Sequence, residues 1–235
     1  MSAIILFLAV IAVIAGWWLS QQRLTAKPWL EEGPMSDFPG TDAMTWPAAK
    51  IGLGVFLAVA SGLFVLFISA YSMRMAMVDW RALPVPTLLW FNTGVLVLSS
   101  VALQWSYVAA RRHDIDGVMV GLLAGGASAV IFLAGQLLAW QQLNAAGYFM
   151  ASNPANSFFY LLTAVHGLHL TGGLVALGRT SAKVWRHDAA TDDISLSVEL
   201  CTIYWHFLLL VWLVLLGLLT GWTDHFVDIC RQLLS

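Results

Sequence analysis

The chain has 235 residues, of which 60% are hydrophobic and only 10% are charged. A soluble domain carries about 25% charged residues, so this chain has too few to cover a water-exposed surface. The net charge of −2 excludes the basic surface of a nucleic-acid-binding protein, and no nucleic-acid partner is expected. The two cysteines, Cys201 and Cys230, provide neither a disulfide framework nor a metal cluster.

Long intervals without charged residues predict the architecture. A membrane helix needs about 20 apolar residues to cross roughly 30 Å of hydrocarbon. The interval 117–178 is too long for one helix, and it contains turn-forming Asn, Gly and Pro residues at 144–157, so it splits into two spans. The sequence therefore predicts an all-α membrane protein with a bundle of about six transmembrane helices. These helices are expected at residues 2–19, 50–72, 87–110, 117–142, 157–179 and 197–222.

The first span is predicted to be a retained helix rather than a signal peptide. It has no basic N-terminal region, and the Trp17-Trp18 pair suits a membrane interface better than a cleavage site. The expected organisation is an N-terminal transmembrane helix (1–22), a cytoplasmic loop (23–49), a five-helix bundle (50–225) and a C-terminal tail (226–235).

The basic residues are distributed unevenly between the two sides of the membrane. Eight of the 11 lie in or beside the loops that follow the first, third and fifth spans. Because Lys and Arg accumulate in cytoplasmic loops, these loops are expected in the cytoplasm and both termini on the outer, periplasmic face. The eight residues are Arg23, Lys27, Lys50, Arg111, Arg112, Arg179, Lys183 and Arg186.

A ridge of glycines on the fourth span predicts close helix packing. Gly117, Gly121 and Gly125 recur every four residues and therefore share one helix face. Small residues at this spacing let helix backbones approach closely in lipid. The pattern indicates a tight bundle and no chemistry.

Histidines within the spans are candidates for a more specific role. His166 and His169 share a face of the fifth span, and His206 lies in the sixth. They could serve as metal ligands, but the spans offer neither a haem-attachment motif nor a cysteine pair for copper. The favoured interpretation is that they are neutral imidazoles that form hydrogen bonds between helices.

The sixth span also carries a carboxylate. Glu199 precedes His206 by two helical turns, and the amphipathic rings of Tyr204 and Trp205 lie between them. Two interpretations remain open with equal weight. Glu199 is either an interfacial residue that meets water, a headgroup or an adjacent chain, or it pairs with His206 inside the membrane.

Four segments resemble subunit III of haem–copper cytochrome c oxidases, and they occur in that family's order. Each is similar to one family motif. The segments are 83–100 (P-x-P…LNTxxLxxSS, with Asn92), 132–136 (FLxxQ, ending at Gln136), 158–173 (FYxxTGxHGxHVxxG) and 199–212 (YWHFVDxVW, with a Glu seven residues before its His).

The sequence departs from the family where the family often has membrane carboxylates. Residues 51–78 contain no acidic residue, and Leu209 and Ala139 replace two others. These departures suggest that the chain does not itself relay protons. Six helices lie between the seven of some family members and the five of quinol-oxidase members, which suggests a divergent bacterial branch.

The resemblance implies a supporting subunit without a redox centre in a proton-pumping cytochrome c oxidase of the bacterial inner membrane. It would pack on subunit I, share the complex with subunit II and hold phospholipids, with a respiratory supercomplex as a further partner. Haem and copper would belong to its partner subunits. The alternatives are subunit III of a quinol oxidase, the accessory protein of nitric oxide reductase, and, more remotely, a metalloprotein using His166, His169 and His206. The structural or lipid-cleft candidates are His166, His169, Glu199, Tyr204, Trp205, His206, Gln136 and Asn92.

Overall fold

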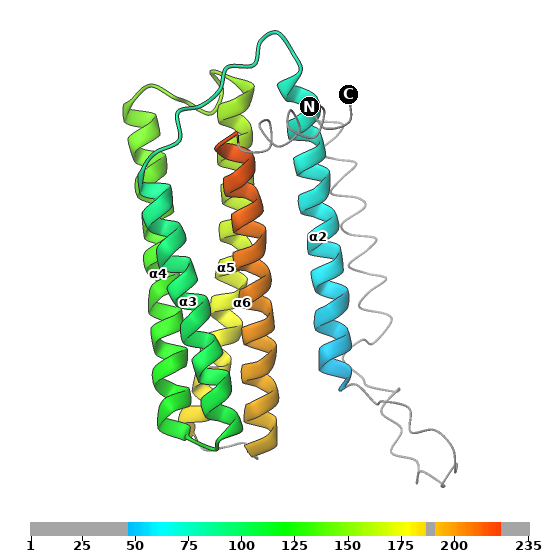
Figure 1. The fold of residues 1–235 in the computed structure, drawn as a ribbon, viewed down its shortest axis with the longest axis vertical. Helices are drawn as coiled ribbons and strands as arrows, with labels where there is room; N and C mark the ends of the chain where they lie inside the picture. Colours follow the sequence, from blue (N-terminus) through cyan, green and yellow to red (C-terminus); the bar gives the residue numbers. More distant parts are fainter. Residues whose placement is uncertain (1–46, 187–190, 222–235) are drawn as a thin grey trace, which may run out of the picture. The chain divides into compact units, whose positions relative to one another are not determined.

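The computed structural model describes residues 47–186 and 191–221, without the side chains of 191–193. These residues form five helices and no strand (Figure 1). The predicted helix 2–19, nearly all of the predicted loop 23–49 and the predicted tail 226–235 lie outside the described residues. The helices are α2 (Ala48–Met75), α3 (Leu88–Arg111), α4 (Ile115–Ala145), α5 (Pro154–Arg186) and α6 (Thr191–Leu219).

Each of the five helices is long and apolar enough to cross a membrane. Their apolar spans measure 24 to 33 residues, against the roughly 20 that a bilayer requires. Five of the six predicted spans are therefore helices in the structure, and the first one, at residues 2–19, lies outside the described residues. At the turn between α3 and α4, a capping side chain determines where the second helix begins. Asp114 caps α4 by accepting a 3.0 Å hydrogen bond from the Gly117 amide.

Two helices extend well beyond their predicted ends. The prediction ended the fifth span at residue 179, but α5 continues to Arg186, and α6 begins at Thr191 rather than at 197. The predicted end of the fifth span is wrong because it was placed at the edge of the charge-free interval 117–178. Lys and Arg are good helix formers, and their long side chains reach water while the backbone stays helical, as in the last turn of α5. Residues 191–196 contain no Lys or Arg, so this reason does not apply to the start of α6.

The last four helices pack as a bundle. α3 packs against α4 and α6, and α5 packs against the same two helices, so α3 and α5 occupy opposite corners. Large side chains fill the interior, and the largest that are fully buried are Trp205, Trp212, Phe132 and Phe159.

The closest approach between α3 and α4 follows the glycine ridge. Gly117, Gly121 and Gly125 are all buried and face α3. A Cβ added to Gly121 would lie 2.6 Å from the Ser106 Cβ, and one added to Gly125 would lie 2.8 Å from Leu103 Cγ. At Gly121 the α3 backbone itself is too close for a methyl group, whereas at Gly125 the close neighbour is a side chain.

α2 lies beside the bundle rather than within it. Only 11% of its apolar span is buried, whereas half of the α6 span is buried. It contacts α5 and α6 at several points along its length: Phe64 and Tyr71 pack with Leu162 and Leu215, and Phe56 packs against Tyr204. This loose association leaves space between α2 and the bundle.

Candidate functional site

Hydrogen bonds between buried side chains join α3 to α4 and α6. The indole nitrogen of Trp205 donates to the Ser99 hydroxyl at 2.8 Å, and Ser99 donates to the Gly125 carbonyl at 2.7 Å. The indole nitrogen of Trp212 donates to the Thr93 hydroxyl at 2.9 Å. Lipid gives helices no hydrophobic reason to associate, so such bonds specify which helix faces pair.

These bonds between α3 and α6, called the polar seam below, continue at His206 and Thr202. His206 Nδ1 and the Ser100 hydroxyl share a hydrogen bond of 2.8 Å, and the Thr202 hydroxyl donates to the Leu103 carbonyl at 3.2 Å. Ser100 and Thr202 are buried, whereas His206 is exposed. The seam therefore reaches from the bundle interior to its outer surface.

His166 lies at the centre of the bundle and is fully buried. Its Nε2 is 3.1 Å from the Leu208 carbonyl oxygen, and because a carbonyl only accepts, Nε2 is the protonated nitrogen. The ring lies between Phe132 and Trp212, with centroid distances of 5.7 and 5.1 Å. Nδ1 has no hydrogen-bond partner among the described residues. His166 thus connects α5 to α6 through the backbone.

His169 faces a different neighbour. Its Nδ1 bonds to the Val165 carbonyl of its own helix at 2.8 Å, and its ring packs against Phe56 and Phe64 of α2. Its backbone carbonyl accepts a 2.8 Å hydrogen bond from the Tyr204 hydroxyl. The three candidate histidines consequently turn in three directions: His166 to the core, His169 to α2 and His206 to the outer face of α6. Among the side chains of residues 47–186 and 194–221, no group of three or more His, Cys, Asp or Glu converges as a metal site would require.

Asn92 and Gln136 are buried amides of α3 and α4. Neither amide has a hydrogen-bond partner among the described residues. Asn92 rests directly on Gly135, where any Cβ would collide with its amide. The glycine therefore lets a polar side chain reach the α4 backbone, at the level of the bundle that also contains Thr93 and Trp212.

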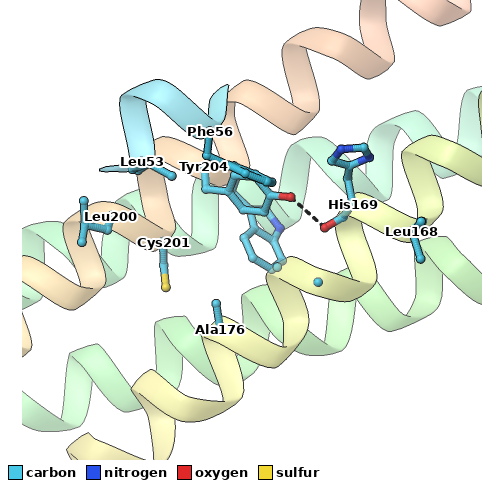
Figure 2. A pocket seen from close by; sticks show the side chains of 11 residues that line it. Leu53, Phe56, Leu168, His169, Ala176, Leu200, Cys201 and Tyr204 are labelled. Carbon is cyan, nitrogen blue, oxygen red and sulfur yellow. Dashed lines mark hydrogen bonds between the residues drawn. The ribbon is translucent and has the colours of Figure 1, made fainter. Parts of the chain in front are cut away.

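An apolar cavity of about 400 Å³ lies between α2, α5 and α6 (Figure 2). Leu53 and Phe56 line it from α2, His169 from α5, and Cys201 and Tyr204 from α6. The hydrogen bond from Tyr204 to the His169 carbonyl crosses the cavity wall, as Figure 2 shows. Because the lining is almost entirely apolar, the cavity suits a hydrocarbon chain better than a polar ligand.

An ion pair joins α2 to α6 close to residues that line this cavity. Lys50 Nζ is 2.6 Å from Glu199 Oε1, and both side chains are 26% exposed. Lys50 precedes the lining residue Leu53 by one turn, and Glu199 adjoins the lining residue Leu200. Glu199 thus pairs with Lys50 and His206 with Ser100, so the Glu199–His206 pairing that the sequence left open is not formed.

Sequence reasoning missed several members of this site. In the sequence, Lys50 indicates only membrane orientation, and the cavity residues Leu53 and Phe56 resemble every other apolar residue of their helix. Ser99 and Ser100 stand out only as the end of a family motif. Their signal was nevertheless present, because two adjacent serines in the middle of an apolar span are polar groups that need partners.

Comparison with known proteins agrees with this picture. Residues 50–224 match the family described as cytochrome c oxidase subunit III. The chain is similar to cytochrome c oxidase subunit 3 of Synechocystis sp., with 32% identity over 70% of this chain and 71% of the relative. It is also similar to cytochrome c oxidase subunit 3 of Thermostichus vulcanus, with 30% identity over 72% of this chain and 85% of the relative. The probable cytochrome c oxidase subunit 3 of Mycobacterium bovis is 36% identical over 52% of this chain, which spans only 60% of that relative's length.

Proposed function

The chain belongs to the cytochrome c oxidase subunit III family, and from this premise we propose that it is the structural, non-redox subunit III of a proton-pumping haem–copper cytochrome c oxidase. In this role it packs on the catalytic subunit I, in a complex that also contains subunit II, and supports stable turnover and proton uptake. The observation that carries the proposal is the polar seam. Ser99, Ser100, Trp205 and His206 belong to the motifs that resemble the family, and they are among the residues that join α3 to α6.

The hydrogen bonds of the three histidines favour a role without a redox centre in this chain. The protonated nitrogen of His166 is bound to a backbone carbonyl, and Nδ1 of His169 and of His206 is also engaged in hydrogen bonds. Ligands of one metal would have to aim at a common point, whereas these three rings face different neighbours. In the proposed complex, haem and copper are therefore held by partner subunits.

A phospholipid is the ligand that the cavity fits best. An acyl chain would occupy the apolar space beside Tyr204 and His169. The ammonium of Lys50, one turn before the lining residue Leu53, would bind a headgroup phosphate through the N–H donors that its bond to Glu199 leaves unused. Native mass spectrometry of the purified complex tests this assignment. We expect one or more retained phospholipids, with reduced occupancy in a Phe56→Ala, Leu53→Ala double variant that removes one wall of the cavity.

The proposed location is the bacterial inner membrane, with both termini on the periplasmic side. Support comes from the eight basic residues that gather on the side of the first, third and fifth loops. A C-terminal alkaline phosphatase fusion should be active, since that enzyme folds only outside the cytoplasm. An inactive fusion together with an active cytoplasmic reporter at the same position would reverse the orientation.

Removing the whole chain from the native complex tests the supporting role. We expect the remaining complex to keep its haem and copper content and its initial rate of oxygen reduction with reduced cytochrome c, and then to lose activity faster during turnover. Loss of one haem or copper per complex, with the partner subunits still assembled, would mean that this chain provides ligands. Oxidation of quinol instead of cytochrome c by the purified complex would assign the chain to a quinol oxidase.

A further inference from the structure

His206 lies on the outer surface of the bundle, near the middle of a helix that has the length and composition to span a membrane. Its Nδ1 is engaged by the Ser100 hydroxyl, whereas its Nε2 makes no hydrogen bond within the described part of the chain. A polar nitrogen without a partner is costly in hydrocarbon. Ionisable residues at this depth consequently face protein or a water-filled cavity rather than lipid.

The outward side of α3 continues this surface. Ser99 faces inward, because it bonds to Trp205 and to α4, so the side beyond Ser100 faces away from the bundle centre. Val101 and Gln104 are exposed on that side, and Val97 lies one turn before them. The exposed amide of Gln104 is one turn from Ser100, which is the residue that bonds to His206.

The outward side of α6 mirrors this arrangement. Trp205 faces inward and His206 outward, and Ile203 and Leu210 lie about one turn before and after His206 on the same side. The Ser100–His206 bond brings the two outward sides together into one surface. This surface, called the outer seam face below, consists of Val97, Val101, Gln104, Ile203, His206 and Leu210.

The outer seam face differs in polarity from other exposed parts of the spans. Exposed hydroxyls elsewhere are satisfied locally: Ser72 donates to the Ile68 carbonyl and Thr171 to the Gly167 carbonyl, each within its own helix. An imidazole nitrogen and a glutamine amide on the outer seam face instead present donors and acceptors outward. Lipid chains offer no complementary groups, but a protein helix does.

We infer that the outer seam face docks against a transmembrane helix of the catalytic subunit, and that this helix presents hydrogen-bonding side chains to His206 and Gln104. The apolar residues of the face supply the surrounding van der Waals contact, and the two polar groups set the register. The inference rests on the proposed function for the identity of the partner. It adds which face of this chain the partner covers and what chemistry the partner carries at that depth.

Site-directed photocrosslinking in the native complex tests the inference. A benzoylphenylalanine residue replaces Val101 or Leu210 on the outer seam face, and Val175 of α5 serves as the matched control, because it is 56% exposed at a comparable depth on another helix. After irradiation in membranes, the complex is purified and the crosslinked peptides are identified by mass spectrometry. We expect Val101 and Leu210 to crosslink to the haem-bearing subunit, and Val175 not to do so.

The outcomes separate the inference from the proposed function. Crosslinks from the outer seam face only to lipid, to a second copy of this chain or to another subunit, in a complex that still contains the haem-bearing subunit, overturn the inference alone. Failure of this chain to copurify with any haem-bearing subunit overturns both.

Two substitutions of His206 supply an independent measurement. His206→Leu keeps the bulk and removes the polar nitrogens, whereas His206→Gln keeps a donor and an acceptor. Measured hydrogen bonds between membrane helices predict that the leucine variant is retained about threefold less in the complex after a detergent wash. The glutamine variant should recover most of this loss. Equal retention of the leucine variant and the unmodified chain would contradict a hydrogen bond across the interface.

Discussion

The contact between α3 and α4 at Gly121 predicts that this position does not accept a side chain. A Cβ there would lie 2.6 Å from the Ser106 Cβ and 2.9 Å from both the Ser106 Cα and the Ala102 carbonyl oxygen. The last two are backbone atoms, so the clash is relieved only if one helix moves. Overfilling a packed core costs about 1–3 kcal/mol. Alanine regains up to about 1 kcal/mol through its higher helix propensity, which partly offsets that cost.

A matched control separates these two effects. Gly94 of α3 is exposed, and a Cβ added there would meet no atom within 4 Å. Gly94→Ala therefore changes helix propensity without a clash, and the difference between the two alanine variants isolates the contact at Gly121. Gly125→Ala should fall between them, because its nearest neighbours are side-chain atoms of Leu103, which can rotate away.

The assay is thermal dissociation of the chain from the purified oxidase. After heating to each temperature, the complex is recovered and the amount of this chain per haem is measured. For a chain of this size, 1 kcal/mol corresponds to a shift of about 2–4 °C in the midpoint. Gly121→Ala should lower the midpoint by about 2–12 °C relative to Gly94→Ala. Equal midpoints for the two variants would refute the reasoning, since they would show that α3 and α4 do not meet closely at Gly121.

Three further predictions concern charged groups and histidine. In a double-mutant cycle, Lys50→Met and Glu199→Gln should show a favourable coupling of about 0.2–1 kcal/mol in the same dissociation assay, because the pair is partly exposed; additive effects would mean that the ion pair contributes nothing. His166→Ala should weaken assembly modestly and leave initial oxygen reduction intact, whereas immediate loss of activity with the chain still bound would contradict a structural role. Arg74 donates two hydrogen bonds to the Asp79 carboxylate, which holds the pKa of that carboxyl below its ordinary value. This ion pair stabilises the segment after α2 fully above the ordinary pKa of Asp79, and the stabilisation is lost as the pH falls through the lowered pKa. An infrared titration that finds the ordinary pKa for the Asp79 carboxyl would contradict this prediction.

The spans could be predicted from the sequence because lipid excludes charge. The five predicted spans from residue 50 onward, which contain few charged residues, each correspond to a helix of the structure, and the turn residues between 144 and 157 separate α4 from α5 as expected. Helix ends could not be predicted in the same way. A helix that leaves the membrane continues in water as long as its residues favour it, as α5 does from Arg179 to Arg186.

The partners of the polar residues were harder to predict from the sequence. Lys50 and Glu199 are 149 residues apart, and no local pattern relates them. His166 and His169 were expected to share a face, since residues three apart are neighbours on a helix. Their side chains nevertheless meet different elements, because α6 and α2 lie on either side of that face. A spacing in sequence fixes the angle between two side chains but not what lies opposite each of them.

The polar residues of the family motifs explain how α3 and α6 pack together. In a soluble bundle, apolar surface alone would drive association, but lipid removes that drive and leaves packing and hydrogen bonds to choose helix partners. The bonds of Trp205 to Ser99 and of Trp212 to Thr93 are two examples. The two tryptophans lie two turns apart on α6, and their partners lie at a similar spacing on α3. Each pair is satisfied only when the two helices stand in one register, since a slip of a single turn would leave buried donors and acceptors unpaired. The polar residues that make these spans look irregular in sequence are therefore the ones that specify how the helices assemble.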